Sequence, residues 1–268
     1  MTTWAIGEYP LMAARLEPAA QRLLEAAEIG RGDTVLDLAT GTGNVALLAA
    51  AAGADVVGVD FEQALLDIAA ERCRAAGLTA RWVKADVGAT TVADHWASAV
   101  LSAFGVMYAS DHDAAAAELG RAVAPDGRIV LAAWVPGSFM PAMGPALAEF
   151  LPAPAAASGP PSRWGDAASL RELGAANGLA MTLHSVEELA LDFVSVDRAT
   201  EFMVRTAGHV IAEKARLMAE GRWDGLLSGV RDLIEARAIR TEHGIVLGLD
   251  YLVATLRPRA ALDHGRPS

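Results

Sequence analysis

A glycine turn in the first quarter of the chain has the composition of a nucleotide-binding loop. Gly41 and Gly43 follow the apolar run TVLDL at residues 34–38. Glycine allows positive φ and a close approach of the backbone to a ligand. The apolar helix predicted over residues 44–52 would point its free N–H groups into the same turn. Because Gly41-x-Gly43-x-x-Ala46 also fits the dinucleotide pattern, the turn alone does not identify the cofactor.

Three carboxylates near this turn favour S-adenosylmethionine (SAM). Asp37 lies inside the first predicted strand, where a carboxylate is costly to bury without a partner. The cationic amino group of SAM would satisfy it, whereas a pyrophosphate would be repelled. Asp60 ends the second strand and could accept both ribose hydroxyls, and Phe61 could face adenine. Asp86 follows the third strand and could accept a hydrogen bond from the adenine amino group. The alternative is that all three acids are ordinary polar residues at strand ends.

Short apolar runs and helical patterns alternate around the turn. This alternation predicts right-handed βαβ units and a parallel sheet. The expected strands cover residues 34–38, 55–59, 80–84, 99–102 and 128–134, the expected helices cover 11–29, 44–52, 62–76 and 111–123, and a turn is expected at 125–127. Asp111 is predicted to cap the last of these helices, because its carboxylate can accept bonds from free N-terminal amides.

The second half of the chain shows a less regular pattern. Residues 136–161 are rich in Pro, Gly and Ala, which predicts a long connection. A helix is expected over 167–177. Strands are expected over 181–193 and 244–256, and residues 197–240 between them have a helical pattern.

Four segments together resemble a known family. VLDLATGTG (35–43), GVDFEQALL (58–66), KADV (84–87) and APDGRIVLAAW (124–134) are similar to the class I SAM-dependent methyltransferases. More narrowly, they resemble the small-molecule group related to the menaquinone/ubiquinone C-methyltransferases. The resemblance implies an α/β, Rossmann-like seven-stranded sheet of order 3-2-1-4-5-7-6, with the last strand antiparallel, helices on both faces and a helical lid.

We also expect a particular organisation of the chain. It would be a single methyltransferase domain over residues 1–268, with a SAM-binding core at 30–135. Residues 1–29 would form an N-terminal helical lid segment. Residues 197–240 would be a helical insert that caps the substrate pocket.

Carried over residue by residue, the resemblance also implies a cofactor site. Asp37, Ala39, Gly41 and Gly43 would hold the methionine part of SAM, Asp60 and Phe61 the ribose and adenine, and Asp86 with Val87 the adenine edge. Ser102, Ala103 and Phe104 would line the sulfonium side, and Tyr9 would cover the cofactor or the substrate. The sequence departs from the family at residues 97–98, where Ala-Ser replaces the usual Phe-Asp. We therefore expect different local packing before the fourth strand and unchanged cofactor contacts.

The candidate catalytic residues are His112, Tyr108 and His209. Methyl transfer from a sulfonium depends mainly on positioning, and a general base is needed only for an acceptor with a proton of high pKa. His112 is the best single candidate for that base, Tyr108 could orient an acceptor, and His209 could lie on a lid. Each also has an ordinary structural explanation. No set of His residues has the spacing of metal ligands, so we predict no metal.

Composition narrows the classes of function. The net charge of −11 and the absence of a basic cluster argue against nucleic acid as a partner. No segment reads as a signal peptide or is long and apolar enough for a membrane span. The single cysteine, Cys73, fits a reducing cytoplasm, where the chain is expected as a monomer or homodimer.

These observations leave three functions open. The first is methyl transfer from SAM to a small, apolar or aromatic metabolite. The second is a SAM-binding protein of the same fold that catalyses a cyclisation or rearrangement without methylation. The third is a nicotinamide-dependent oxidoreductase, which only the Gly41–Ala46 pattern supports and which Asp37 and Asp86 oppose.

Overall fold

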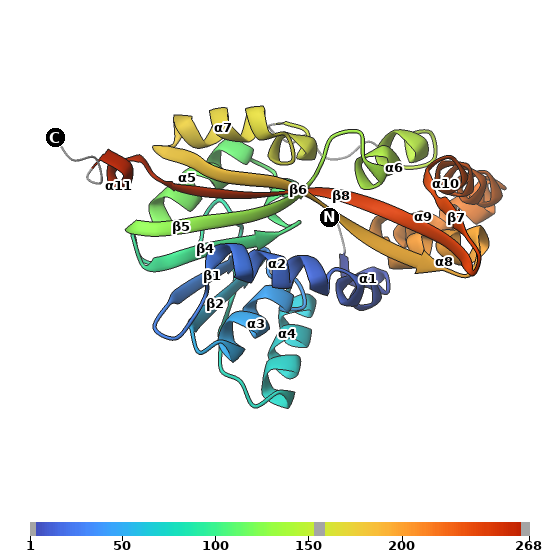
Figure 1. Cartoon of the computed structure of the whole chain (residues 1–268). Coiled ribbons are helices and arrows are strands. Elements are labelled where there is room, and N and C mark those ends of the chain that lie inside the picture. Colours follow the sequence, from blue (N-terminus) through green and yellow to red (C-terminus); the bar gives the residue numbers. More distant parts are fainter. Residues whose placement is uncertain (1–3, 153–158, 264–268) are drawn as a thin grey trace.

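A computed structural model describes residues 4–152 and 159–263, and it is built around one mixed β-sheet (Figure 1). The strands of the described residues are β1 (Thr34–Leu38), β2 (Asp55–Asp60), β3 (Arg81–Lys84), β4 (Ala97–Ala103), β5 (Val123–Trp134), β6 (Leu179–Phe193), β7 (Ile239–Thr241) and β8 (Gly244–Pro258). Their order is β3-β2-β1-β4-β5-β8-β6, and the first five strands run parallel. Strand β8 is antiparallel to both β5 and β6. The predicted fold and strand order are confirmed, and the predicted count of seven becomes eight because the short β7 pairs with β8.

Helices cover both faces of this sheet, with α2, α3 and α4 on one side and α5 and α7 on the other (Figure 1). The helices are α1 (Tyr9–Arg15), α2 (Glu17–Ala27), α3 (Asn44–Ala51), α4 (Gln63–Ala75), α5 (His112–Ala122), α6 (Phe139–Leu147), α7 (Ala167–Ala176), α8 (Val196–Thr206), α9 (Gly208–Ala219), α10 (Trp223–Arg237) and α11 (Arg259–Asp263). Three short 3-10 helices are η1 (Trp4–Ile6), η2 (Val106–Tyr108) and η3 (Pro161–Trp164). The central strands are apolar runs that lie buried between these layers, as expected for parallel strands covered on both faces.

The long strands β6 and β8 connect the helical segment at residues 197–240 to the sheet. Strand β8 pairs with β5 only from Tyr251 to Leu256, whereas it pairs with β6 along almost its whole length. Its first residues, 244–250, therefore extend beyond the carboxyl end of β5. Helices α6, α8, α9 and α10 gather around this extension (Figure 1). The predicted helical character of residues 197–240 is confirmed.

Two predictions differ from the structure. The helix expected over residues 11–29 is two helices, α1 and α2, that meet at Leu16. Pro18 cannot donate a backbone hydrogen bond, so it ends one helix and suits the first turn of the next. Residues 136–161, expected to be a long connection, contain helix α6. Its Pro141 lies in the first turn, where the N–H is not needed, although Pro145 lies inside the helix. Part of that segment, 153–158, lies outside the described residues.

The turn expected at 125–127 lies inside β5. Val123 pairs with Ala97 and Arg128 pairs with Ala99, so the residues between them bulge out of the ladder. The helix predicted to end at Val123 therefore ends one residue earlier, and the strand predicted to begin at Arg128 begins at Val123. Asp111 caps α5 as predicted, and its Oδ1 accepts bonds from the backbone N–H groups of Asp113 and Ala114.

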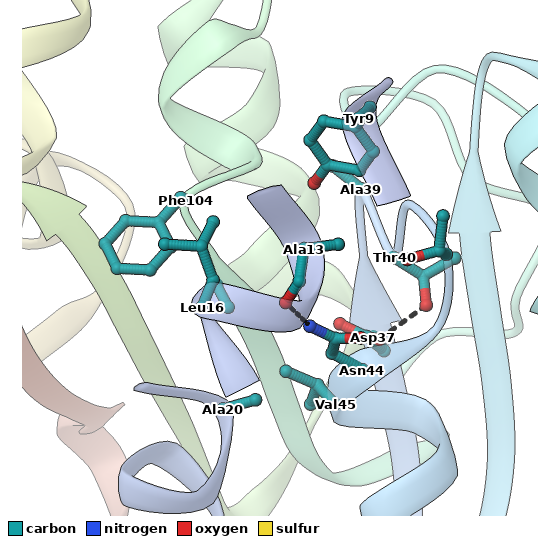
Figure 2. Close-up of a pocket in the computed structure, with 12 residues that line it drawn as sticks. Tyr9, Ala13, Leu16, Ala20, Asp37, Ala39, Thr40, Asn44, Val45 and Phe104 are labelled. Atoms are coloured by element: carbon teal, nitrogen blue, oxygen red, sulfur yellow. Dashed lines mark hydrogen bonds between the residues drawn. The ribbon is translucent and has the colours of Figure 1, made fainter. Parts of the chain in front are cut away.

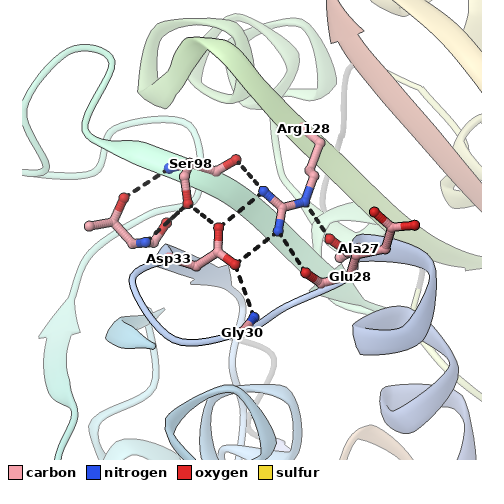
Figure 3. A network of polar contacts seen from close by, with 7 residues as sticks. Ala27, Glu28, Gly30, Asp33, Ser98 and Arg128 are labelled. Atoms are coloured by element: carbon pink, nitrogen blue, oxygen red, sulfur yellow. Dashed lines mark hydrogen bonds and ion pairs between the residues drawn. The ribbon is translucent and has the colours of Figure 1, made fainter. Parts of the chain in front are cut away.

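Arg128 connects helix α2 to the sheet (Figure 3). Its guanidinium donates to the carbonyls of Ala27 and Glu28 at the end of α2, and to the Ser98 carbonyl at 3.2 Å. It also forms a paired contact with Asp33 at 3.0 and 3.1 Å. Burial alone would raise the pKa of Asp33, but the hydrogen bonds from Arg128, Ser98 and Gly30 outweigh it and lower that pKa. The Ser98 hydroxyl, at the position where the sequence departs from the family that it resembles, thus belongs to this network.

Replacing Arg128 should destabilise the fold. Arg128→Met leaves the last carbonyls of α2 and the half-buried Asp33 carboxylate without their donor. We expect the free energy of unfolding to fall by about 3 kcal/mol, the order of cost for losing one partner of a buried pair. Urea denaturation measures this. The matched control is Arg240→Met on the exposed β7, expected to change stability by less than about 0.5 kcal/mol; equal losses in both variants would contradict the role of the network.

Candidate functional site

The glycine turn lies at the carboxyl ends of β1 and β4, where the strand order reverses direction. In open α/β sheets this switch point is the usual ligand site. Ala39, Gly41 and Gly43 all have positive φ, at 52°, 56° and 83°. A Cβ placed on Gly41 would lie 3.2 Å from the hydroxyl oxygen of Tyr9. The turn is therefore a tight backbone structure in which Tyr9 lies directly against the loop.

Asp60 holds the turn in place from the end of β2. Only 4% of its surface is exposed. Its Oδ2 accepts a bond from the N–H of Gly41, and its Oδ1 accepts one from the N–H of Glu62, both at 2.9 Å. Burial raises the pKa of Asp60, while these two bonds act in the opposite direction. The carboxylate predicted to bind ribose thus also fixes the backbone of the glycine turn.

Asp37 is the most deeply buried acid of the site, with 1% of its surface exposed. Its Oδ2 accepts bonds from the Thr40 hydroxyl at 2.5 Å and from the N–H of Ala46 at 3.1 Å. Burial raises the pKa of Asp37 to about 7, and the nearby Asp60 adds to that rise. A carboxylate with such a pKa favours a cationic ligand group close to it.

A small cavity of about 30 Å³ lies above the turn (Figure 2). Its lining comes from α1, α2, the glycine turn and the end of β4, and consists of Tyr9, Ala13, Leu16, Ala20, Asp37, Ala39, Thr40, Thr42, Asn44, Val45, Ala103 and Phe104. Pockets for cofactor-sized molecules hold about 300 Å³ or more. The cavity is therefore smaller than a nucleotide-sized ligand needs, and α1 lies across it.

Four aromatic rings gather where the N-terminal segment meets the insert. The ring of Trp4 lies 6.0 Å from Tyr9, 5.1 Å from Tyr108 and 6.5 Å from His209, measured between ring centres. Burial lowers the pKa of His209, and burial with nearby Asp60 raises that of Tyr9. The structure thus brings together two of the three predicted catalytic candidates, Tyr108 and His209, with the predicted cover residue Tyr9.

The third candidate, His112, lies elsewhere. It is fully buried at the start of α5, and its ring meets Trp164 edge-on at 5.9 Å. Burial, followed by the charge of Arg163, lowers its pKa. His112 does not line the cavity above the glycine turn. Its role as a base remains a prediction.

The remaining predicted cofactor residues differ in their exposure to solvent. Phe61 is half-exposed and Asp86 is exposed, with its Oδ1 accepting a bond from the N–H of Gly88, whereas Val87 is buried. Ala103 and Phe104 line the cavity, and Phe104 stacks on Trp134 with ring centres 3.8 Å apart.

The side chain of Ser102 is engaged within the protein. Its hydroxyl donates to the Leu38 carbonyl at 2.7 Å and accepts from the N–H of Val106 at 3.0 Å. Ser102 therefore joins β4 to β1 and to η2. Any contact it makes with a ligand falls to its backbone.

Sequence reasoning missed three polar residues of the site. Thr40 hydrogen-bonds Asp37, and Asn44 and Arg72 bind to each other beside the turn at 2.8 Å. The positions of Thr40, three residues after the buried acid, and of Asn44, directly after Gly43, offered a signal for two of them. Arg72 lies on another helix, so no local pattern could reveal it.

The described residues also bear on metal binding and membrane insertion. Among residues 4–152 and 159–263, no three His, Cys, Asp or Glu side chains are grouped closely enough to hold a metal ion. In the same part of the chain, no helix combines the length and apolar character needed to cross a bilayer.

Comparison with known families identifies the core. A family described as a methyltransferase domain matches residues 35–127. An uncharacterized protein of Mycobacterium tuberculosis is 39% identical over 163 residues, which are 60% of this chain and 60% of that protein. A demethylmenaquinone methyltransferase of Thermus thermophilus is 43% identical over 104 residues, 38% of this chain and 47% of that enzyme. The match thus spans less than two thirds of either relative. These similarities confirm the predicted resemblance to class I SAM-dependent methyltransferases related to the menaquinone enzymes.

Solved structures share the fold at low identity. The YcgJ protein of Bacillus subtilis has a TM-score of 0.64 at 14% identity and covers 89% of this chain and 97% of that one. The cyclase SpnF has a TM-score of 0.57 at 20% identity, covering 90% and 80%. A phosphoethanolamine N-methyltransferase of Haemonchus contortus, solved with S-adenosylhomocysteine, has a TM-score of 0.55 at 17% identity, covering 90% and 52%. At such identities the likeness establishes the fold alone.

Proposed function

We propose that this chain, whose residues 35–127 match a methyltransferase domain family, is a SAM-dependent enzyme that methylates a small apolar or aromatic acceptor. The observation that carries the proposal is the pair of buried acids at the glycine turn. Asp37 is a nearly inaccessible carboxylate suited to a cationic group, and Asp60 fixes the turn from the next strand. A pyrophosphate would meet negative charge from both acids.

The residues present fit SAM. The turn is left-handed at Gly41 and Gly43, and a side chain at either position would press against Tyr9 or Leu47, so only glycine suits both. In our proposal Asp37 and the turn hold the methionine part. Asp60 binds the ribose, and Phe61 with Asp86 and Val87 borders the adenine. When bound, SAM supplies an electrophilic methyl group.

The chain's own contribution is enclosure and orientation. The N-terminal segment, residues 1–29, acts as a lid over the turn, and the insert at 197–240 caps the acceptor. The cluster of Trp4, Tyr9, Tyr108 and His209 supplies flat, largely apolar walls, and the lowered pKa of His209 keeps its imidazole neutral near pH 7. In our proposal the imidazole of His209, in its neutral form, accepts a proton from an acceptor hydroxyl. We propose cytoplasmic action on a metabolite, by a monomer or homodimer, without nucleic acid.

A labelled cofactor tests methyl transfer directly. We expect the purified chain to move a deuterated methyl group from SAM to members of a panel of phenols, quinols and small amines, as measured by product mass. SAM binding without any labelled product, together with an isomerised acceptor of unchanged mass, would replace methyl transfer by the alternative, a cyclisation or rearrangement. The shared fold of the cyclase SpnF makes that outcome worth measuring.

A further inference from the structure

The junction between α1 and α2 places a main-chain carbonyl over the glycine turn. Ala13 lies in the last turn of α1, where carbonyls lack a complete set of partners within the helix. Its oxygen accepts a bond from the N–H of Leu16 at 3.1 Å and a shorter one, at 2.6 Å, from the side-chain amide of Asn44 (Figure 2). Asn44 is the first residue of α3 and follows Gly43 directly. The side chain of Asn44 thus forms a polar link between the N-terminal helix and the turn.

Arg72 determines which way the Asn44 amide points. Its Nη1 donates to Asn44 Oδ1 at 2.8 Å, and it also donates to the carbonyl of Thr42 at 2.6 Å and the hydroxyl of Thr42 at 3.2 Å. Arginine only donates hydrogen bonds, so the oxygen of the amide must face it. The NH₂ group then faces Ala13. The turn, Arg72 and Asn44 therefore form one hydrogen-bonded unit that ends on α1.

The N-terminal end of α1 is attached separately to the helical insert at residues 197–240. The N–H of Glu8 donates to the Arg205 carbonyl at 3.0 Å, and the Glu8 carboxylate forms an ion pair with the Arg205 side chain at 3.2 Å. Gly7 packs so closely on Gly208 that a Cβ at position 7 would lie 2.9 Å from the Gly208 nitrogen. Helix α1 thus spans from the insert to the glycine turn.

We propose that Asn44 is a positioning residue that couples the order of the glycine turn to closure of α1 over the cofactor. The proposal rests on the SAM-dependent function above and adds the link between cofactor site and lid. The cavity beneath α1 holds about 30 Å³, so in this proposal α1 opens for the cofactor to enter. A cofactor that orders the turn also orders Arg72 and Asn44, and so presents the amide donor to Ala13. Closure of α1 then slows cofactor release.

Asn44→Asp separates the two halves of this link. The new carboxylate still accepts from Arg72, so the turn keeps its support, but it cannot donate to Ala13 and repels that carbonyl. We expect S-adenosylhomocysteine to dissociate about tenfold faster, the effect of losing one hydrogen bond. In hydrogen–deuterium exchange, the ligand should protect both α1 and residues 44–51 in the unaltered chain, and only residues 44–51 in the variant.

A matched control and a second variant complete the experiment. Asn177→Asp removes an equivalent bond, from the Asn177 amide to the Leu173 carbonyl at 2.9 Å in α7, and should leave release and α1 exchange unchanged. Asn44→Ala removes the donor without adding charge and should also lose α1 protection. Normal ligand-dependent protection of α1 in either folded Asn44 variant would overturn the coupling alone. Absence of S-adenosylhomocysteine binding to the unaltered chain would overturn the proposed function as well.

Discussion

Asp60→Ala should weaken binding of S-adenosylhomocysteine by about 100-fold or more. In our account the substitution removes two charge-assisted bonds to the ribose, each contributing roughly 1.5–3 kcal/mol. It also frees the N–H of Gly41, which Asp60 now holds at 2.9 Å. The turn loses its anchor on β2 together with the ribose contact. Isothermal titration of the purified variant gives the dissociation constant.

The control for this variant lies on the same strand. Asp55 begins β2 at its exposed end, away from the turn. Asp55→Ala should bind S-adenosylhomocysteine as the unaltered chain does. If both substitutions left affinity unchanged, Asp60 would have no part in cofactor binding. If both weakened it equally, the effect would come from the stability of β2.

Affinity for the cofactor product should depend steeply on pH because of Asp37. Its pKa of about 7 in the free protein means that the carboxyl is increasingly protonated below neutrality. A neutral carboxyl attracts a cationic amino group less strongly. From about pH 8 to about pH 5 we expect the affinity for S-adenosylhomocysteine to fall by about 90-fold, as expected for one group of that pKa that must be ionised.

The same group affects the stability of the free protein in the opposite sense. The folded-state pKa of Asp37 lies above the ordinary value of about 3.9, so the folded state binds more protons between about pH 4 and pH 7. The contribution of Asp37 is therefore fully present at low pH and is lost as pH rises through about 7. Asp37→Asn is the matched control, because it is neutral at every pH. Its binding should lose the pH dependence, and a variant that retained the full dependence would assign it to another group, such as Asp60.

The parallel core could be predicted well because the residues that specify it lie close together in the sequence. The apolar run at residues 34–38, Gly41 and Gly43 lie within ten positions, and each residue has a conformational reason for its place. The break at Leu16 was missed because a helical pattern on both sides hid the effect of Pro18. The bulge at 124–127 was predicted as a simple turn, since its pairing depends on Ala97 and Ala99 of another strand.

In the candidate site, too, some positions follow from the local sequence and others depend on contacts with distant segments. The positions of Asp37 and Asp60 follow from strand ends, so their approach to the turn could be expected from sequence. Ser102 has the right place but uses its hydroxyl within the protein. Arg72 lies on helix α4, 30 positions after Thr42 of the turn that it contacts. Contacts of this kind depend on tertiary packing. Whether each predicted residue touches the cofactor remains a prediction.

The most direct measurement of the central claim is isothermal titration of the unaltered chain with S-adenosylhomocysteine and, in parallel, with NADH. The account predicts saturable binding of S-adenosylhomocysteine with one site per chain and no binding of NADH, because two buried acids border the glycine turn. Failure to bind S-adenosylhomocysteine at millimolar concentration, or binding of NADH in its place, would contradict it.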